Sequence, residues 1–261
     1  MIIMNAAKRV LEFGGKSFTP SVRKLSDMKD VIYDTEWMKS APDMDLYYMY
    51  RDVHLSRQDH NIAMDNNLRY DITVIPPGRL GKELVKTAGH YHPPVSDTTD
   101  LTYPEVYEVL KGKAHYLLQK AENGKITDAI IVEAEAGDKV IIPPNYGHVT
   151  INPTENKELM MANWVSREFS SIYEPYKECR GAAYYELAGG ILIKNEKCGP
   201  VPEIRHMKPT NISKVGFQKG KEMYGLVRDV QKLEWLNKPQ DYGWLWEEIL
   251  GGKSAAKASI K

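Results

Sequence analysis

The amino-acid sequence predicts an all-β fold, either closed into a barrel or folded into two facing sheets. From Leu68 onward, apolar and polar residues alternate with the period of two that is typical of strands. Eight or more such short segments follow one another, and turn residues separate them, as at 76–78 and 122–124. Many short strands joined by such turns favour a double-sheet or barrel architecture.

The expected strands follow one another through the middle of the chain, after a less regular start. Residues 1–15 are weakly helical, most clearly at 6–12, residues 33–39 are expected to form a short helix, and the polar stretch 54–67 is expected to be a loop. The expected strands cover residues 45–53, 68–75, 83–87, 105–110, 114–119, 126–133, 139–142, 148–151 and 159–165, and a hairpin covers 182–195.

The pattern changes after Gly199, which suggests a division of the chain. Residues 1–198 are expected to form one β domain with short N-terminal additions, and residues 199–261 a partly helical C-terminal extension. Its aromatic residues are expected to anchor it on the β domain rather than to bind a ligand. The residues concerned are Trp235, Trp244 and Trp246. The end of the chain, from residue 251, is expected to fray.

Composition excludes several classes of protein. The 261 residues include 35 basic and 35 acidic ones, and the pI is near 7.1, so no basic surface for nucleic acid is expected. Two cysteines are too few for a secreted disulfide scaffold, and we expect free thiols in a reducing cytosol. No apolar run is long enough for a signal peptide or a membrane span. We therefore expect a cytoplasmic protein without nucleic-acid or membrane partners.

Three histidines and one glutamate are the strongest candidates for a functional site. On an extended strand, side chains two residues apart share a face, so His90 and His92 point the same way, as do Glu105 and Tyr107. His148 follows a Pro-Pro turn further along the chain. Three imidazoles and one carboxylate suit a divalent transition metal with positions left for water or substrate. Strand histidines without a common role are the alternative explanation.

The spacing of this set resembles the two motifs of the cupin superfamily, in which His-x-His, a Glu and a later His bind one metal inside a jelly-roll barrel. Glu105 lies seven residues before Gly112, and His148 lies five after Pro143 and four before Asn152. The resemblance therefore implies a cupin jelly-roll β-barrel.

The sequence departs from the cupin pattern at three places. Leu84 stands where the first motif begins with glycine, and Asn145 stands where the second has a glycine three residues before its last ligand. Asparagine tolerates the left-handed backbone better than other side chains, so this second change is mild. Twelve residues separate His92 from Glu105, which indicates an inserted loop around 93–102.

A narrower resemblance links the chain to the archaeal cupin-type glucose-6-phosphate isomerases over about residues 20–195. The extension from 199 is not covered. The motifs that carry this resemblance are SVRKLSDM (21–28), TVIPPG (73–78) with GKE (81–83), KTAGHYH (86–92), EVY (105–107), LKGK (110–113) and residues 143–152.

This resemblance implies a homodimer whose barrel holds one divalent transition metal beside a phosphosugar. Iron is the expected metal, with nickel, manganese or zinc as alternatives. The position of a tyrosine that lines the family's pocket corresponds to a place near Trp164 in this chain, where no tyrosine stands. Tyr173 is therefore the better candidate for this contact. By motif position, the metal ligands are His90, His92, Glu105 and His148, the phosphate contacts are Thr73, Thr87 and the backbone of Gly89, and the sugar contacts are Tyr107 and Tyr173.

The implied reaction interconverts glucose 6-phosphate and fructose 6-phosphate, a step of glycolysis and gluconeogenesis. Glu105 is the expected catalytic base that removes the C2 proton, and a hydride shift between C2 and C1 would need the same residues. Cupins support many activities, so three alternatives stay open. These are isomerisation of mannose 6-phosphate or another phosphosugar, a metal-dependent dioxygenase, and a sugar-binding regulatory protein without catalysis.

Overall fold

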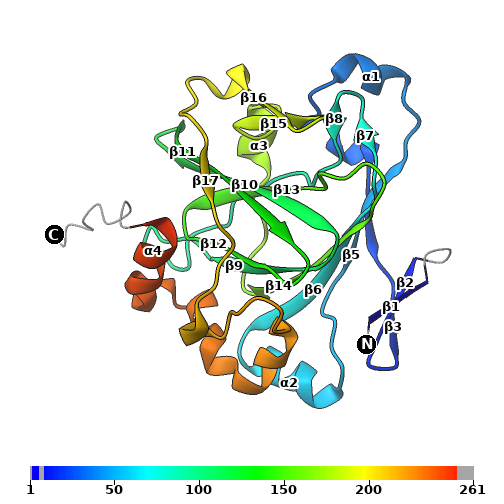
Figure 1. Ribbon diagram of the computed structural model, residues 1–261. Helices are drawn as coiled ribbons and strands as arrows, with labels where there is room; N and C mark the ends of the chain where they lie inside the picture. The colour runs from blue at the N-terminus through cyan, green and yellow to red at the C-terminus, as the bar shows by residue number, and fades with distance from the viewer. Residues whose placement is uncertain (1, 6–8, 252–261) are drawn as a thin grey trace.

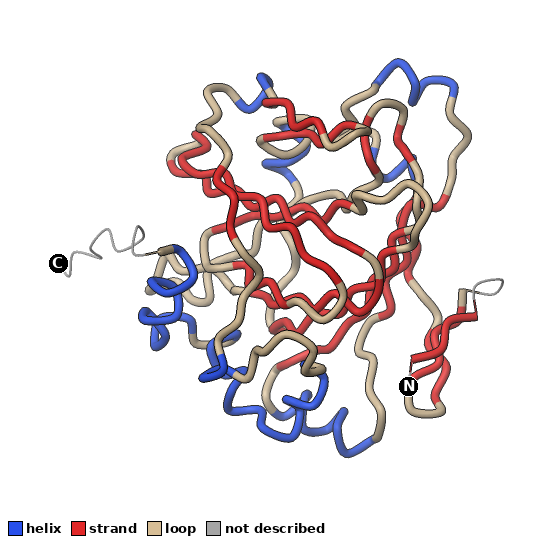
Figure 2. Tube along the Cα trace, in the orientation of Figure 1, coloured by secondary structure: helices blue, strands red, loops and turns tan. Residues whose placement is uncertain are grey.

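The computed structural model describes residues 2–5 and 9–251, and β-sheets form its centre (Figures 1 and 2). Two mostly antiparallel sheets carry the main core, and short helices lie around them. The all-β prediction is confirmed. The strands of the described residues stay in separate sheets, so the double-sheet form of a jelly roll applies rather than a continuously hydrogen-bonded barrel.

The larger sheet has six strands, and all neighbours in it are antiparallel. In spatial order they are β12 (Lys139–Ile142), β9 (Glu105–Lys111), β14 (Leu159–Ser166), β6 (Leu68–Ile75), β5 (Asp45–Tyr50) and β4 (Ser21–Lys24).

The second sheet has four strands and supplies the other wall of the core. Its strands are β13 (Tyr146–Ile151), β10 (Lys113–Glu122), β11 (Lys125–Glu135) and β17 (Arg205–Met207), of which β17 runs parallel to β11. Two smaller sheets complete the described strands. One contains β16 (Ile191–Lys194), β15 (Tyr184–Leu187), β8 (Glu83–Leu84) and β7 (Arg79–Leu80), and the other β1 (Ile2–Asn5), β2 (Val10–Phe13) and β3 (Lys16–Phe18).

The helices of the described residues are short, and most lie at the periphery (Figure 2). No helix in this part of the chain is long and apolar enough to cross a membrane. The α-helices are α1 (Thr35–Ser40), α2 (Arg57–Asp65), α3 (Glu174–Glu178) and α4 (Gly243–Leu250), and the 3-10 helices are η1 (Leu25–Met28), η2 (Glu196–Cys198), η3 (Ser213–Val215), η4 (Met223–Leu236) and η5 (Pro239–Tyr242).

The central strand β6 shows how the period of two organises the molecule. Its residues Tyr70, Ile72 and Val74 face outward and join an apolar core with the C-terminal extension. Asp71 and Thr73 are also buried, but they point to the opposite face, toward the second sheet. One strand therefore serves both an apolar outer core and a polar interior.

The C-terminal extension covers the outer face of the six-stranded sheet near β6 and β14 (Figure 1). Trp164 of β14 donates from its indole nitrogen to the carbonyl of Met223, at 3.1 Å. Trp235 and Trp246 are buried in this layer, as the sequence predicts. Trp244 is only partly buried, and the ammonium of Lys214 lies 3.7 Å from its ring centroid.

Two predicted local structures are wrong. Residues 10–13 of the expected N-terminal helix form β2, which pairs with β1 and β3, while residues 6–8 lie outside the described part. The expected loop 54–67 contains helix α2. The hydroxyl of Ser56 caps it by accepting from the Asp59 N–H, and Tyr224 of the extension donates to the Asp59 carboxylate at 2.9 Å. A cap and a distant contact, rather than hydrophobic periodicity, stabilise this helix. The expected frayed end lies outside the described residues from 252 onward.

Burial predicts unequal roles for the tryptophans of the extension. Trp235 is fully buried, with ring centroids 5.8 Å from Trp246 and 6.1 Å from Phe217. Trp235→Ala should therefore lower the free energy of unfolding by about 3–5 kcal/mol, measured by chemical denaturation. The matched control, Trp244→Ala, should cost clearly less because that ring is partly exposed. Equal losses in the two variants would contradict the packing described here.

Candidate active site

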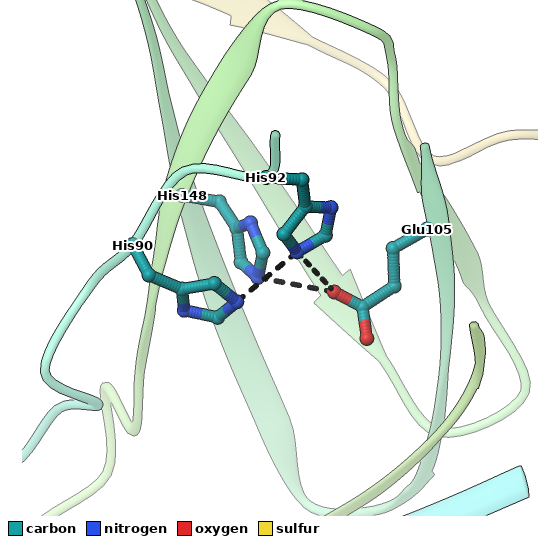
Figure 3. A group of neighbouring side chains, drawn as sticks. All are labelled: His90, His92, Glu105 and His148. Carbon is teal, nitrogen blue, oxygen red and sulfur yellow. Dashed lines mark hydrogen bonds and ion pairs between the residues drawn. The ribbon is translucent and has the colours of Figure 1, made fainter. Parts of the chain in front are cut away.

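Four side chains from three segments converge between the two large sheets (Figure 3). His90 and His92 lie on the segment after β8, Glu105 begins β9, and His148 lies within β13. His90 and His148 exchange two backbone hydrogen bonds, of 3.2 and 3.0 Å, which fixes these two segments against each other. One nitrogen or oxygen atom of each of the four residues lies within 4.8 Å of all the others. The structure thus brings together the four residues that the sequence selects.

The polar atoms of the cluster point at one another. The Nε2 atoms of His90 and His92 are 3.1 Å apart. Glu105 Oε2 lies 3.5 Å from His92 Nε2 and 3.4 Å from His148 Nε2 (Figure 3). Glu105 Oε2 is buried and has no hydrogen-bond donor among the described residues. Such an arrangement leaves a buried acceptor and several nitrogen lone pairs facing one small volume.

Neighbouring groups hold two of the four side chains in this orientation. His92 Nδ1 lies 2.7 Å from the carbonyl oxygen of Tyr103, which can only accept, so Nδ1 carries the proton and Nε2 is free to bind. Asn163 donates from its side-chain nitrogen to Glu105 Oε1 at 2.7 Å. Oε2 is therefore the oxygen left to face the histidines.

Burial sets the protonation of the cluster. It lowers the pKa of His92 to about 4 and holds the pKa values of His90 and His148 well below their usual range, so the imidazoles are neutral at pH 7. Burial also raises the pKa of Glu105 to about 8. Without a cation this carboxyl is therefore mostly protonated at pH 7, and a divalent ion would replace that proton. Three neutral imidazoles and one such carboxyl are the donor set that fits a divalent transition metal.

Most of the predicted substrate contacts line the pocket around this cluster. Thr73, Thr87, Tyr107 and Tyr173 are among its lining residues. The Tyr107 hydroxyl lies 3.1 Å from His148 Nε2, and the Tyr173 ring centroid lies 5.5 Å from that of His90. Thr87 accepts a hydrogen bond from the Thr150 N–H at 2.9 Å, which leaves its hydroxyl hydrogen free to donate.

Gly89 does not itself line the pocket, although its two neighbours do. Its backbone has φ of +75°, and a Cβ at this position would meet the ring of Tyr176 and a methyl of Val149 at 2.6 Å. The chain can therefore make this close turn before His90 only with glycine.

Asn145, which stands where the cupin motif has glycine, binds the end of the inserted loop 93–102. Asn145 has a φ of +70°, the conformation for which the cupin pattern uses glycine. Its backbone N–H donates to the hydroxyl of Thr102, and its side-chain oxygen accepts from the Thr102 N–H, at 2.7 and 3.0 Å. Asn145 thus anchors the end of the loop, directly before the Tyr103 carbonyl that orients His92.

Arg51, Arg69, Asn163 and Phe169 are among the pocket-lining residues that sequence reasoning missed. The ring of Phe169 lies 4.3 Å from that of His92. A signal for Arg69 was present, because polar residues at 69, 71 and 73 alternate with apolar ones. No comparable pattern marks the other three. Trp164 points to the outer core, so the position near it supplies no tyrosine to the pocket.

Comparisons with known proteins identify the family. A family model described as glucose-6-phosphate isomerase (GPI) matches residues 22–203, well over half of the chain. The glucose-6-phosphate isomerase of Thermococcus litoralis is 35% identical over 143 residues, which cover 54% of this chain and 67% of that protein. That of Pyrococcus furiosus is 33% identical over 142 residues, with coverages of 54% and 68%.

Solved structures with partial likeness include hazelnut (Corylus avellana) vicilin, with a TM-score of 0.36, 16% identity and coverage of 60% of this chain and 32% of that one. Oxalate decarboxylase from Bacillus subtilis has a TM-score of 0.34 and 16% identity over 49% and 27% of the two chains. The fold follows from the strand order above, and the family follows from the sequence matches. This chain belongs to the glucose-6-phosphate isomerase family.

Proposed function

We propose that this protein interconverts glucose 6-phosphate and fructose 6-phosphate with the help of a divalent transition metal. Family membership makes it an isomerase. The observation that supports the metal is the buried Glu105 carboxylate, whose Oε2 has no donor and faces three neutral imidazoles. We propose iron as the ion, with nickel, manganese or zinc as alternatives. The ligands would be His90, His92, Glu105 and His148.

Glu105 is the proposed catalytic base. When bound, a divalent ion would polarise the C1 carbonyl of the open-chain sugar and acidify the C2 hydroxyl. Asn163 holds Glu105 Oε1 in place beside the histidines, and this carboxylate would remove the C2 proton and return it at C1. The Tyr107 hydroxyl is in position to donate to a sugar oxygen beside His148. A hydride shift between C2 and C1 would use the same side chains for orientation.

Other parts of the pocket would bind the rest of the substrate. We propose that the hydroxyls of Thr73 and Thr87 and the backbone at Gly89 contact the phosphate, and that Tyr173 contacts the sugar. Phe169 and Tyr173 both lie against the histidine cluster, where their rings exclude water from the reacting atoms. We also propose a cytoplasmic homodimer acting in glycolysis or gluconeogenesis, with residues 1–198 as the isomerase domain and 199–261 as its packed extension.

The direct test of the activity is a coupled assay on fructose 6-phosphate. The protein should form glucose 6-phosphate, lose this activity with a chelator, and regain it when a divalent metal is added back. Mannose 6-phosphate, assayed in parallel, separates the nearest alternative substrate. Full activity in protein shown by elemental analysis to be metal-free would contradict the metal, and no turnover with metal present would contradict the reaction.

The metal assignment makes a second prediction. Wild-type protein should hold about one divalent ion per chain, and His90→Ala or His148→Ala should strongly reduce this content, because each variant loses one of four ligands. Elemental analysis of the purified proteins gives the readout. His206→Ala is the matched control, since that histidine is exposed and lies outside the cluster. Full occupancy in both ligand variants would refute the assignment.

The base assignment makes a third prediction. Glu105→Gln keeps a neutral oxygen ligand but cannot take up a proton, so kcat at saturating metal should fall by more than ~100-fold, the lower end of what a general base supplies. Normal turnover by this variant would make Glu105 a ligand only.

The control for this variant must be an exposed glutamate. Glu108 points to the opposite strand face, as parity predicts, but it is buried, bonds to Lys139 at 3.0 Å and accepts from the Met223 N–H at 2.7 Å. Its replacement would disturb the fold. Glu133 on β11 is exposed, so Glu133→Gln should keep normal turnover.

A further inference from the structure

Two arginines share one buried aspartate on the wall of the pocket. Arg51 Nη1 donates to Asp71 Oδ2 at 2.7 Å, and Arg69 Nε donates to both Asp71 oxygens at 3.0 and 2.9 Å. The backbone N–H of Asp52 adds a further bond to Asp71 Oδ1, at 2.8 Å. Asp71 is fully buried, while the side chains of Arg51 and Arg69 keep 45% and 28% of their surface exposed. The guanidinium groups therefore remain reachable from the pocket.

The charges of this cluster do not balance. Two guanidinium groups oppose a single carboxylate, which leaves one positive charge on this part of the wall. Arg51 and Arg69 are the only arginine or lysine residues among the described residues that line the pocket. Glu105, the carboxylate that lines the pocket, faces the histidines. An anion that enters this pocket therefore meets a net positive charge at this wall.

The cluster is also arranged to donate hydrogen bonds. A guanidinium has five N–H donors, and the bonds to Asp71 use one nitrogen of each arginine. Both Nη atoms of Arg69 are left over. Asp71 accepts hydrogen bonds from Arg51, Arg69 and the Asp52 N–H. The two guanidinium groups are therefore held in place before a ligand arrives, which lowers the entropic cost of binding.

The position of the cluster matches the proposed phosphate contacts. Asp71 and Thr73 are two residues apart on β6, so their side chains share the inner face. Across the ladder, Met49 of β5 is paired with Thr73, and Arg51 follows two residues later on the same side. A step of two residues along a strand, as from Met49 to Arg51, spans about 6.6 Å, a distance that an arginine side chain can cover. The same anion can thus contact the Thr73 hydroxyl and a guanidinium.

We propose that Arg51 and Arg69, positioned by Asp71, form the cationic clamp that binds the phosphate group of the substrate. The proposal rests on the phosphosugar isomerase function above and adds the residues that supply charge to it. Threonine hydroxyls and a backbone N–H are neutral, whereas a phosphate dianion in a partly buried pocket needs a countercharge. Asp71 touches no substrate in this account and acts as a positioning residue.

The test measures phosphate affinity and kinetics in the metal-loaded protein. Arg51→Gln and Arg69→Gln should each raise KM for fructose 6-phosphate by about 10- to 100-fold, with a smaller change in kcat, because each loses a hydrogen bond to a charged acceptor. The double variant should also lose binding of inorganic phosphate, measured by calorimetry. Arg79→Gln is the matched control, since Arg79 forms an exposed ion pair with Glu155 outside the pocket.

The outcomes separate this proposal from the proposed function. If the wild type isomerises fructose 6-phosphate while the double variant keeps its KM and its phosphate affinity, the arginines serve only to hold Asp71, and the clamp is overturned. If the double variant loses phosphate binding but the wild type shows no isomerisation, the clamp stands and the reaction is wrong. Should the glutamine variants fail to fold, the Arg51→Lys, Arg69→Lys double variant keeps the charge opposite Asp71 but not the planar fork. An unchanged KM there would overturn the clamp.

Discussion

The buried carboxylate of Glu105 is the constraint on which the site depends. Only 4% of this residue is exposed, one of its oxygens has no donor in the described chain, and burial raises its pKa to about 8. A carboxylate in such a place is costly unless a cation or a proton compensates its charge. The three histidines cannot supply that charge, because burial keeps their pKa values low. A divalent ion would satisfy all four side chains at once, which is why the arrangement is best explained as a metal centre.

The two faces of the six-stranded sheet connect this centre with the rest of the protein. Neighbouring residues on β14 take opposite roles: Asn163 points inward and holds Glu105, whereas Trp164 points outward and bonds to the extension. On β6, Asp71 points inward and binds the pocket residues Arg51 and Arg69, while Tyr70 packs against Trp164 with ring centroids 4.9 Å apart. The apolar outer face stabilises the sheet, and this stabilisation offsets the cost of burying polar and charged side chains on the inner face. The C-terminal extension therefore stabilises the strands that present the site without lining the pocket.

The four clustered residues were predictable because their spacing along the chain is itself informative. His90 and His92 share a strand face, and Glu105 and His148 follow at motif distances. The strands were predictable for the same reason, since the period of two is local. The failures have local causes too. Helix α2 depends on the Ser56 cap and on Tyr224, 165 residues further along from Asp59, which no short window contains.

The remaining pocket residues needed strand register, which sequence alone does not provide. Asn163 reaches Glu105 because β14 lies between β6 and β9, and Arg51 reaches Asp71 because β5 pairs with β6. The bond between Asn145 and Thr102 likewise joins a motif departure to an inserted loop across 43 residues. These contacts are long-range consequences of topology, so they appear only once the sheets are assembled.

The central claim is that a metal bound by Glu105 and three histidines serves the isomerisation. Anomalous X-ray scattering from crystals of protein that isomerises fructose 6-phosphate tests it most directly. The account predicts one strong anomalous peak per chain, enclosed by His90, His92, Glu105 and His148. An active crystal sample with no peak there, or with its metal held by other residues, would contradict it.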